Sequence, residues 1–309
     1  MKKVKILICL VVFLWFNLLV TGCQAQPDYG IAEVFVFGTG KADAILITTE
    51  NFTVMIDAGE NRHGQMLADE LLNLGLTEID YLIITHFHKD HVGGVRRIIE
   101  NLTVNNVIVP DYGKSSRRYN QFVAATERAG LEPFVLTETI KLTLDKVEFT
   151  LYPPGQPYAE FGFAGNDENE EEDEDDYDDI INVSEVREND FSIVTSVRHG
   201  NNDFLFTGDA VAKRLAELLL TEDIINTDYD FLKVPHHGRY NELSTEFISV
   251  ISPKYAVITC SLENQPDIRV ISALLEAEAE MFFTVFGGVH FISDGSVLNA
   301  AAILFVINT

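Results

Sequence analysis

The sequence predicts an α/β fold in which two β-sheets pack together with helices on their outer faces. Two observations support this prediction. Apolar runs of strand length are mixed with amphipathic segments of helix length, and several strands follow one another without a helix between them. The predicted elements form two halves of similar texture on either side of an acidic run, and no linker separates independent domains. We therefore expect a single domain.

The first predicted half begins with three consecutive strands and ends with two. Apolar residues at helical spacing predict its helices, and short apolar runs predict its strands. Gly75 and Gly130 are expected to end two of the helices. Strands are expected at 33–37, 44–48, 53–56, 81–85, 106–109 and twice within 140–152, and helices at 65–74, from 95 onward and at 118–129.

The second predicted half repeats this mixture of strands and helices, and it closes with short strands near the C-terminus. Its strands are expected at 191–198, 204–207, 231–234 and 255–259, and its helices at 211–220, 245–251 and 268–277.

The N-terminal segment has the layout of an export signal. Lysines at positions 2, 3 and 5 precede an apolar run, and the run is followed by Val-Thr-Gly-Cys ending at Cys23, which looks like a bacterial lipobox. An uncleaved membrane anchor is the alternative, but Asn17 interrupts the run, which is shorter than the ~20 residues of a membrane span. We expect a signal peptide over 1–22, lipidation of Cys23, a tether over 23–30 and a folded domain over 31–309.

This layout predicts an exported lipoprotein, held on the cell surface or the periplasmic face of a bacterial membrane by its lipid. Cleavage before Cys23 would remove Cys9 and leave Cys260 as the sole thiol, so we expect no internal disulfide.

The chain is strongly acidic, with a formal net charge of −26. Such a charge disfavours long-range association with nucleic-acid backbones, although Lys114, Arg117 and Arg118 could form a local basic patch that steers a phosphate. Residues 167–179 are almost all acidic and cannot bury a core, which predicts a solvated insertion at about 165–188. A calcium loop is the alternative, but the run lacks the glycine that an EF-hand loop requires.

A compact H-x-H-x-D-H cluster is the main functional signal of the first half. His86, His88, Asp90 and His91 lie between a predicted strand and Gly93-Gly94. Imidazole and carboxylate groups are ligands that zinc and similar divalent ions prefer. A surface loop that merely contains histidines is the alternative, and it is disfavoured because closely packed imidazoles repel one another once protonated. The cluster therefore predicts a metal site.

Two strands of the second half end in residues of the same kinds. Asp209 follows the strand predicted at 204–207, and His236 and His237 follow the strand at 231–234. Taken alone, Asp209 could simply cap the helix predicted from residue 211. Together with the histidine cluster, these residues predict the second part of one metal site.

These motifs resemble those of the metallo-β-lactamase superfamily of hydrolases, and within it the branch that includes the C-terminal domain of ComEC-type competence proteins. The resemblance covers roughly 31–299 and implies a four-layer αββα sandwich with the site at one edge between the sheets. It is carried by the segments 40–47, 55–59, 86–94, 189–192, 207–209, 236–238 and 284–295.

The resemblance implies the following ligands. The first metal would be bound by His86 and His88, and the second by Asp90 and His91. Asp209 would bridge the two ions. Either His236 or His237 would complete the second site, and their spacing does not distinguish them.

The resemblance also implies supporting residues and one departure from the family pattern. Asp57 matches a position that supports the ligand loop, and Asp43 is assigned a similar role. At the third motif many members have a histidine ligand for the first metal, whereas this chain has Asn189 and Asp190. The first site is therefore expected to be weaker or more open. Arg239 stands where the branch often has serine.

We expect two divalent ions, zinc first and manganese as the alternative. Ions about 4 Å apart can share a water and convert it to a bridging hydroxide. The expected function is an exported metal-dependent hydrolase, a phosphodiesterase or other phosphoesterase acting on a small or envelope-polymer substrate, with Asp90, His91 and Asp209 as catalytic residues. A nuclease linked to DNA uptake, a non-catalytic metal-containing surface lipoprotein and a β-lactam hydrolase are the alternatives.

The remaining motifs carry no function. Residues 38–41 do not satisfy the phosphate-loop pattern, which needs a longer spacing before its Gly-Lys. His63, His199 and His290 lie outside all the motifs and are predicted to be ordinary surface or capping histidines.

Overall fold

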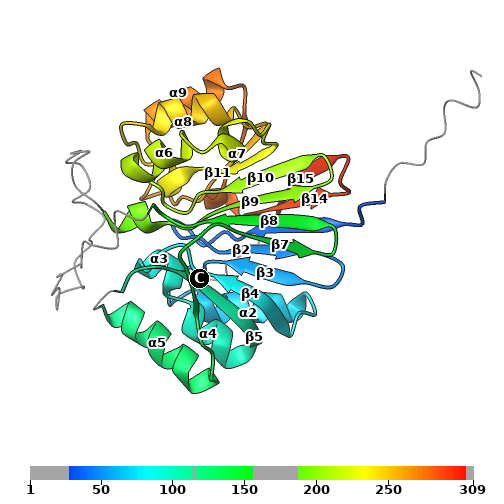
Figure 1. The fold of residues 1–309 in the computed structure, drawn as a ribbon, viewed down its shortest axis with the longest axis vertical. Helices are drawn as coiled ribbons and strands as arrows, with labels where there is room; N and C mark the ends of the chain where they lie inside the picture. The colour runs from blue at the N-terminus through cyan, green and yellow to red at the C-terminus, as the bar shows by residue number, and fades with distance from the viewer. Residues whose placement is uncertain (1–27, 114–115, 156–186, 304–309) are drawn as a thin grey trace, which may run out of the picture.

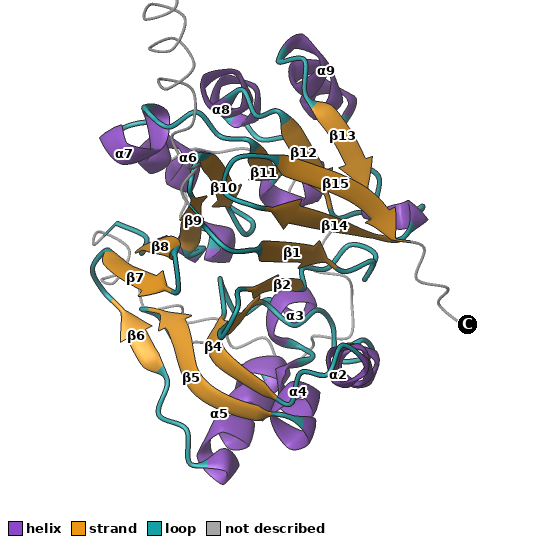
Figure 2. Cartoon of the chain, turned by 90° about the vertical axis from the view of Figure 1, so that its right-hand side faces the viewer, coloured by secondary structure: helices purple, strands orange, loops and turns teal. Residues whose placement is uncertain are grey.

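The computed structural model describes residues 28–113, 116–155 and 187–303. Two sheets face each other, and helices cover the outer face of each (Figure 1, Figure 2). The predicted four-layer αββα sandwich is therefore confirmed. The predicted signal peptide, Cys23, Lys114 and nearly all of the acidic insertion lie outside the described residues.

The first sheet has eight strands in the order β15-β14-β1-β2-β3-β4-β5-β6. Strands β3 to β6 are parallel, whereas β1 pairs antiparallel with both β2 and β14. The C-terminal strands thus complete the sheet that the N-terminal strand begins. The bounds are β1 Ala32–Val36, β2 Ile45–Thr48, β3 Thr53–Ile56, β4 Glu78–Ile83, β5 Thr103–Pro110, β6 Phe134–Leu136, β14 Gly288–Ser293 and β15 Leu298–Ile303.

The second sheet has seven strands in the order β13-β12-β11-β10-β9-β8-β7. Strands β10 to β13 are parallel, and β7 to β10 are antiparallel. The bounds are β7 Ile140–Leu144, β8 Val147–Tyr152, β9 Val194–His199, β10 Asn202–Phe206, β11 Phe231–Lys233, β12 Tyr255–Ile258 and β13 Glu280–Phe283.

The helices of each half of the chain cover a different sheet. The outer face of the first sheet carries α2 to α5, and that of the second carries α6 to α9 (Figure 1). The bounds are α2 Gly64–Asn73, α3 Lys89–Val92, α4 Val95–Asn101, α5 Arg117–Ala129, α6 Ala212–Leu218, α7 Glu222–Ile225, α8 Ser244–Ile251 and α9 Ile268–Glu276, with short 3₁₀ helices η3 Glu188–Phe191, η4 Pro235–Gly238 and η5 Thr284–Phe286. No helix in the described part of the chain is long and apolar enough to cross a membrane.

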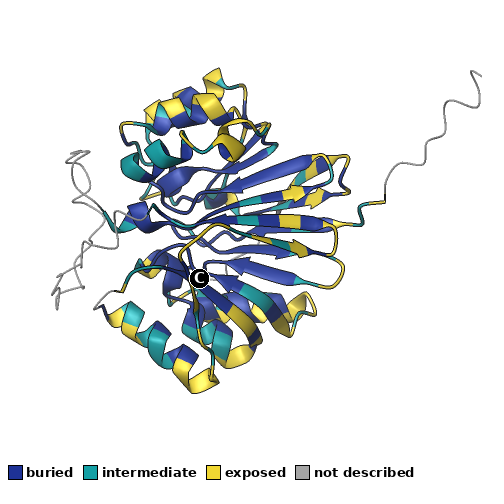
Figure 3. Ribbon diagram, in the orientation of Figure 1, coloured by how far each residue is buried: buried dark blue, intermediate teal, exposed yellow. Residues whose placement is uncertain are grey.

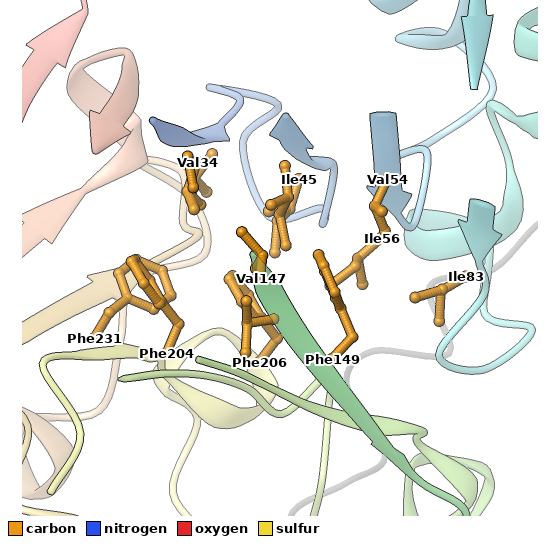
Figure 4. Packing of buried hydrophobic residues seen from close by; sticks show 14 of the residues in the cluster. Val34, Ile45, Val54, Ile56, Ile83, Val147, Phe149, Phe204, Phe206 and Phe231 are labelled. Carbon is orange, nitrogen blue, oxygen red and sulfur yellow. The ribbon is translucent and has the colours of Figure 1, made fainter. Parts of the chain in front are cut away.

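Three apolar clusters hold the four layers together. One lies between the sheets, and one lies between each sheet and its helices. The sheets are therefore buried on both faces, and exposed residues concentrate on the outer sides of the helices (Figure 3). Among the residues of the central cluster that Figure 4 labels, aliphatic side chains of the first sheet face mostly aromatic side chains of the second. The labelled residues are Val34, Ile45, Val54, Ile56 and Ile83 on one side and Val147, Phe149, Phe204, Phe206 and Phe231 on the other.

The structure moves some predicted boundaries. Residues 188–191 form η3, so β9 begins at Val194 rather than at 191, and the predicted insertion cannot extend to 188. The sequence prediction also missed β6, α3 and α7. The two helices are single turns, and β6 has only three residues, of which Phe134 and Val135 are exposed. Elements this short give no readable periodicity.

His199 is not the surface or capping histidine that was predicted. It is fully buried at the end of β9, where Nδ1 lies 2.8 Å from Ser293 Oγ and Nε2 lies 2.9 Å from the Tyr29 carbonyl oxygen. Ser293 Oγ in turn donates to Asn202 Oδ1 at 2.8 Å. This polar cluster joins β9 and β10 of one sheet to β14 of the other.

Candidate metal centre

The predicted site residues follow the C-terminal ends of parallel strands. In the first sheet, Asp57 follows β3 and the H-x-H-x-D-H segment follows β4. In the second sheet, Asp209 follows β10 and the two histidines of η4 follow β11. Parallel neighbours end at the same edge of a sheet, and here these edges of the two sheets face each other, because Thr259 after β12 donates to Asp43 Oδ1 at 2.7 Å. The site lies at this shared edge.

The H-x-H-x-D-H segment combines an irregular stretch with a single helical turn. His88 is extended, and α3 begins immediately after it. Glycine is required at the end of this turn, because a Cβ on Gly94 would lie 2.0 Å from the Ala58 carbonyl oxygen. The turn therefore packs directly on the loop after β3, and the Ala58 N–H donates to the His91 carbonyl oxygen at 2.8 Å. Backbone contact between these two loops fixes the direction of the ligand side chains.

Four predicted ligands converge in a buried cluster. One ligand atom from each of Asp90, His91, Asp209 and His237 lies within 4.8 Å of the others. His91 Nε2 and His237 Nε2 lie 3.1 and 2.9 Å from Asp209 Oδ2, and His237 Nε2 lies 3.4 Å from Asp90 Oδ2. Neither ring nitrogen has a hydrogen-bond partner among the described residues, although both are buried. Buried nitrogens and carboxylates that converge in this way fit a divalent cation.

The outer nitrogen of each of these two histidines is held by a partner. His91 Nδ1 lies 2.7 Å from Asp57 Oδ2. His237 Nδ1 lies 2.9 Å from Thr259 Oγ1, and since the Thr259 hydroxyl donates its only hydrogen to Asp43, its oxygen accepts a hydrogen bond from the ring. Both rings thus carry hydrogen on Nδ1 and direct Nε2 toward the carboxylates, the orientation found in metal-ligating histidines.

Asp57 is held in an unusual conformation to reach His91. Its backbone φ is +58°, which is uncommon for a residue other than glycine, and its side chain is completely buried. Besides His91, it accepts hydrogen bonds from the backbone and the hydroxyl of Thr85 at 2.8 and 2.7 Å. Burial raises the pKa of the Asp57 carboxyl despite the opposing effect of His91. The predicted supporting position of Asp57 thus corresponds to a contact that orients His91.

A second pair of nitrogens lies beside this cluster. His86 Nε2 and His88 Nδ1 are 3.0 Å apart. His86 Nδ1 lies 3.1 Å from Thr85 Oγ1, which donates its proton to Asp57 and therefore accepts from the ring. The ring centroid of His86 is 4.1 Å from that of His91, so the two groups of donors are neighbours. Burial, followed by the charges of His91 and His88, lowers the pKa of His86 well below its usual value.

The two histidines that sequence spacing could not distinguish occupy different positions. His237 joins the cluster of four, whereas His236 Nε2 lies 3.3 Å from Asn189 Nδ2. Both have positive φ, 49° and 54°, and η4 turns their side chains into the buried site. Asp190 is turned elsewhere: its oxygens accept hydrogen bonds from the backbone N–H groups of Arg187 and Arg214. Asn189 therefore lies beside the cluster and Asp190 does not.

Lys233 was not anticipated from the sequence. It is fully buried, with Nζ 2.5 Å from Asp43 Oδ2, 3.3 Å from Asp209 Oδ1 and 2.9 Å from the Gly208 carbonyl oxygen. Burial would lower its pKa, but Asp43 and Asp209 raise the pKa above the usual value. The available signal was a lysine within an otherwise apolar strand.

Glu188 was assigned to the acidic insertion and is instead a partly buried neighbour of the histidines. Its side chain is 10% exposed, and Oε2 lies 3.2 Å from His88 Nε2. Tyr112 donates to Glu188 Oε1 at 2.8 Å and accepts from the Phe87 N–H at 2.7 Å. One glutamate at the end of an acidic run carried no signal that distinguished it from the others.

The charges in the cluster compensate one another. Burial would raise the pKa of Asp90 and of Asp209, but neighbouring histidines, and Lys233 in the case of Asp209, hold both pKa values well below the usual range. Burial would lower the pKa of His91, but Asp209 and Asp57 hold it well above the usual value. The positive charges of the histidines and of Lys233 thus neutralise the buried carboxylates.

Comparison with known proteins gives three relevant matches. ComE operon protein 3 of Bacillus subtilis is 22% identical over 287 residues, covering 86% of this chain and 32% of that protein, so the chain spans about a third of this relative. Ribonuclease Z of Nanoarchaeum equitans is 35% identical over 78 residues, covering 23% of this chain and 24% of that protein. The structure of Tm1679, described as a metal-dependent hydrolase of the beta-lactamase superfamily, is similar with a TM-score of 0.52 at 12% identity, covering 88% of this chain and 100% of that one. This similarity concerns the fold alone.

A family model described as "Metallo-beta-lactamase superfamily" matches residues 37–261, a segment that contains every residue of the cluster. The chain therefore belongs to the metallo-beta-lactamase superfamily, and its similarity to ComE operon protein 3 supports the ComEC-like branch predicted from its motifs.

Proposed function

We propose that this chain is a metal-dependent hydrolase that cleaves phosphoester bonds, most simply as a phosphodiesterase. The observation that carries the proposal is the buried convergence of Asp90, His91, Asp209 and His237, two of whose ring nitrogens have no hydrogen-bond partner in the described part of the chain. A binding module would not need two buried carboxylates and two oriented imidazoles around one point.

Two ions fit the donors, zinc first and manganese as the alternative. His86 Nε2 and His88 Nδ1 would hold the first, and Asp90, His91 and His237 the second, with Asp209 between them. When bound, the ions would supply a water of lowered pKa and stabilise negative charge on a phosphoryl oxygen. Asp90 would orient the attacking water.

Positive charge near the cluster supports an anionic substrate. Lys41 Nζ is 4.0 Å from Asp90 Oδ2. Burial lowers the pKa of His236, and the positive charges of Lys41 and Arg239 lower it further, so both cations lie near this buried ring. In a chain of net charge −26, Lys41 beside Asp90 and Arg239 near His236 favour a phosphate group over a neutral substrate.

The relatives support the same chemistry. Ribonuclease Z is by name a nuclease, and ComE operon protein 3 resembles most of this chain. A nuclease linked to DNA uptake is therefore the second candidate. We favour a small or envelope phosphodiester, because the overall negative charge opposes binding to a long polyanion. Export and lipidation at Cys23 belong to the same proposal and are supported by the N-terminal sequence.

The test uses the purified protein with zinc or manganese and bis(p-nitrophenyl) phosphate. His88→Ala and Asp209→Ala should each lower turnover by more than about 100-fold, since even the partners of metal ligands account for 10–100-fold. His290→Gln, a histidine on β14 that contacts Glu33 and Phe35, is the matched control and should retain activity. Undiminished turnover in His88→Ala would refute the proposal.

Substrate classes are compared in the same preparation. Poly(glycerol phosphate) should be cleaved faster than linear DNA, and the reverse order would favour the nuclease. Rapid opening of a chromogenic β-lactam without phosphodiester cleavage would favour a lactamase. Bound metal without turnover on any of the three would favour a non-catalytic binding lipoprotein.

A further inference from the structure

The pair formed by His86 and His88 contributes only two ring nitrogens to a first ion. Among the described residues, neither histidine belongs to a group of three or more possible ligands whose atoms all lie within 4.8 Å of one another. At the third motif Asp190 is engaged by backbone N–H groups, and the side-chain nitrogen of Asn189 faces His236. Something else must therefore define this end of the site.

Glu188 is the acidic side chain that reaches this pair. Its Oε2 lies 3.2 Å from His88 Nε2, on the side of the ring opposite to the nitrogen that faces His86. The carboxylate is almost fully enclosed, and the hydroxyl of Tyr112 donates to its other oxygen at 2.8 Å. Tyr112 also accepts a hydrogen bond from the backbone N–H of Phe87, which lies between the two histidines in the sequence. Tyr112 therefore connects Glu188 to the loop that carries His86 and His88.

We propose that Glu188, held by Tyr112, is a positioning residue for the first metal: it keeps the hydrogen of His88 on Nε2, so that Nδ1 is the unprotonated nitrogen that would bind the ion beside His86 Nε2. The proposal rests on the metal-dependent function proposed above and adds the residue that defines its weaker site.

The hydrogen-bond pattern of the other histidines supports this assignment. His86, His91 and His237 each have Nδ1 engaged by an outer oxygen, which directs Nε2 inward. His88 is reversed, because its Nδ1 faces His86 and its Nε2 faces Glu188. Without Glu188, a neutral His88 could place its hydrogen on Nδ1 and donate it to His86 Nε2. In that arrangement His88 Nδ1 and His86 Nε2 would be hydrogen-bonded to each other, and neither could bind the ion.

Charge supports the same role. A second ion would have Asp90 as a direct ligand, and Asp57 contacts His91 as Glu188 contacts His88. A first ion held by two neutral imidazoles and a shared Asp209 would have less negative charge around it. A carboxylate one ring away raises the basicity of the ligating nitrogen and supplies part of that charge.

The experiment measures metal affinity and ring tautomer rather than activity alone. Zinc content and competition with a chelator are compared for the wild-type chain, Glu188→Gln and Asp57→Asn. Glu188→Gln should weaken one of two ions by about 10–100-fold and leave the other unchanged. Combining it with His88→Ala should add no further loss, whereas Asp57→Asn combined with His88→Ala should also weaken the second ion by about 10–100-fold.

A second measurement needs no metal. Long-range ¹⁵N correlations of the histidine rings in the metal-free protein should show His88 with hydrogen on Nε2, and Glu188→Gln or Tyr112→Phe should shift it toward Nδ1, with the folded state checked by circular dichroism. Two ions bound with wild-type affinity in a folded Glu188→Gln protein would overturn the assignment while leaving the hydrolase proposal intact. A wild-type chain that binds no ion would overturn both.

Discussion

Lys233 offers a direct test of how the metal centre is neutralised. Its ammonium group contacts Asp43 and Asp209 and is completely shielded from solvent. In Lys233→Met the side chain retains a similar volume, so little cavity forms, but two buried carboxylates lose their shared cation. The perturbation therefore removes the charge and the hydrogen bond to the Gly208 carbonyl oxygen with little change in volume.

The structure sets the expected size of the effect. Removing one partner of a buried ion pair typically costs about 3–5 kcal/mol of unfolding free energy, since it leaves an uncompensated buried charge. At about 2–4 °C for each kcal/mol in a domain of this size, the metal-free variant should melt roughly 6–20 °C lower than the wild type. Divalent ions bound beside Asp209 would replace the lost charge, so metal should raise the melting temperature more in the variant than in the wild type.

The assay is thermal unfolding followed by circular dichroism, with chelator and with added zinc. Lys141→Met is the control, because Lys141 is 71% exposed and its ion pair with Asp223 lies on the surface, so its melting temperature should not change. An unchanged melting temperature of metal-free Lys233→Met, or the same zinc-induced increase in variant and wild type, would refute the charge-compensation argument.

Three further predictions concern other parts of the fold. Burial lowers the pKa of His63 to about 4. Between about pH 6.5 and 4 the unfolded chain therefore binds a proton that the folded chain does not, and the free energy of unfolding falls as the pH falls. Urea titrations at several pH values should show that His63→Gln makes this pH dependence weaker. Gly94→Ala would place a Cβ 2.0 Å from the Ala58 carbonyl oxygen and should lose about 1–3 kcal/mol or more in urea unfolding, whereas Gly113→Ala, whose Cβ would meet only an ordinary contact, should lose little. His237→Ala should bind about one ion fewer than the wild type in metal analysis, and equal metal content would show that this histidine is not a ligand.

The fold and the main donors could be predicted because their signals are local. Mixed strands and helices indicated two sheets, and His86 to His91 lie within one short segment. Asp209 and the two histidines after β11 could be identified because each follows an apolar strand. The choice between His236 and His237 could not be made, since it depends on two consecutive left-handed residues that direct adjacent rings to different partners.

The supporting residues depend on tertiary contacts and were harder to predict. Thr259 acts on His237 from a different strand, and Glu188 acts on His88 from the far side of the acidic run. Lys233 resembles an irregularity in an apolar strand until the carboxylates around it are known. His199 was misjudged for the same reason, because its partners Ser293 and Tyr29 lie at distant positions in the sequence.

The two ends of the inter-sheet contact are fastened in different ways. At one end of β10, Asn202 belongs to the hydrogen-bonded cluster of His199 and Ser293, which needs no ion. At the other end, Asp209 lies beside predicted metal ligands from both sheets. The repulsion between its carboxylate and that of Asp90 is relieved by nearby positive charge. Loss of metal should therefore destabilise the contact between the sheets at the metal-site edge and not at the edge that contains His199 and Ser293. Backbone hydrogen exchange should then rise after β4, β10 and β11 before it rises around Ser293.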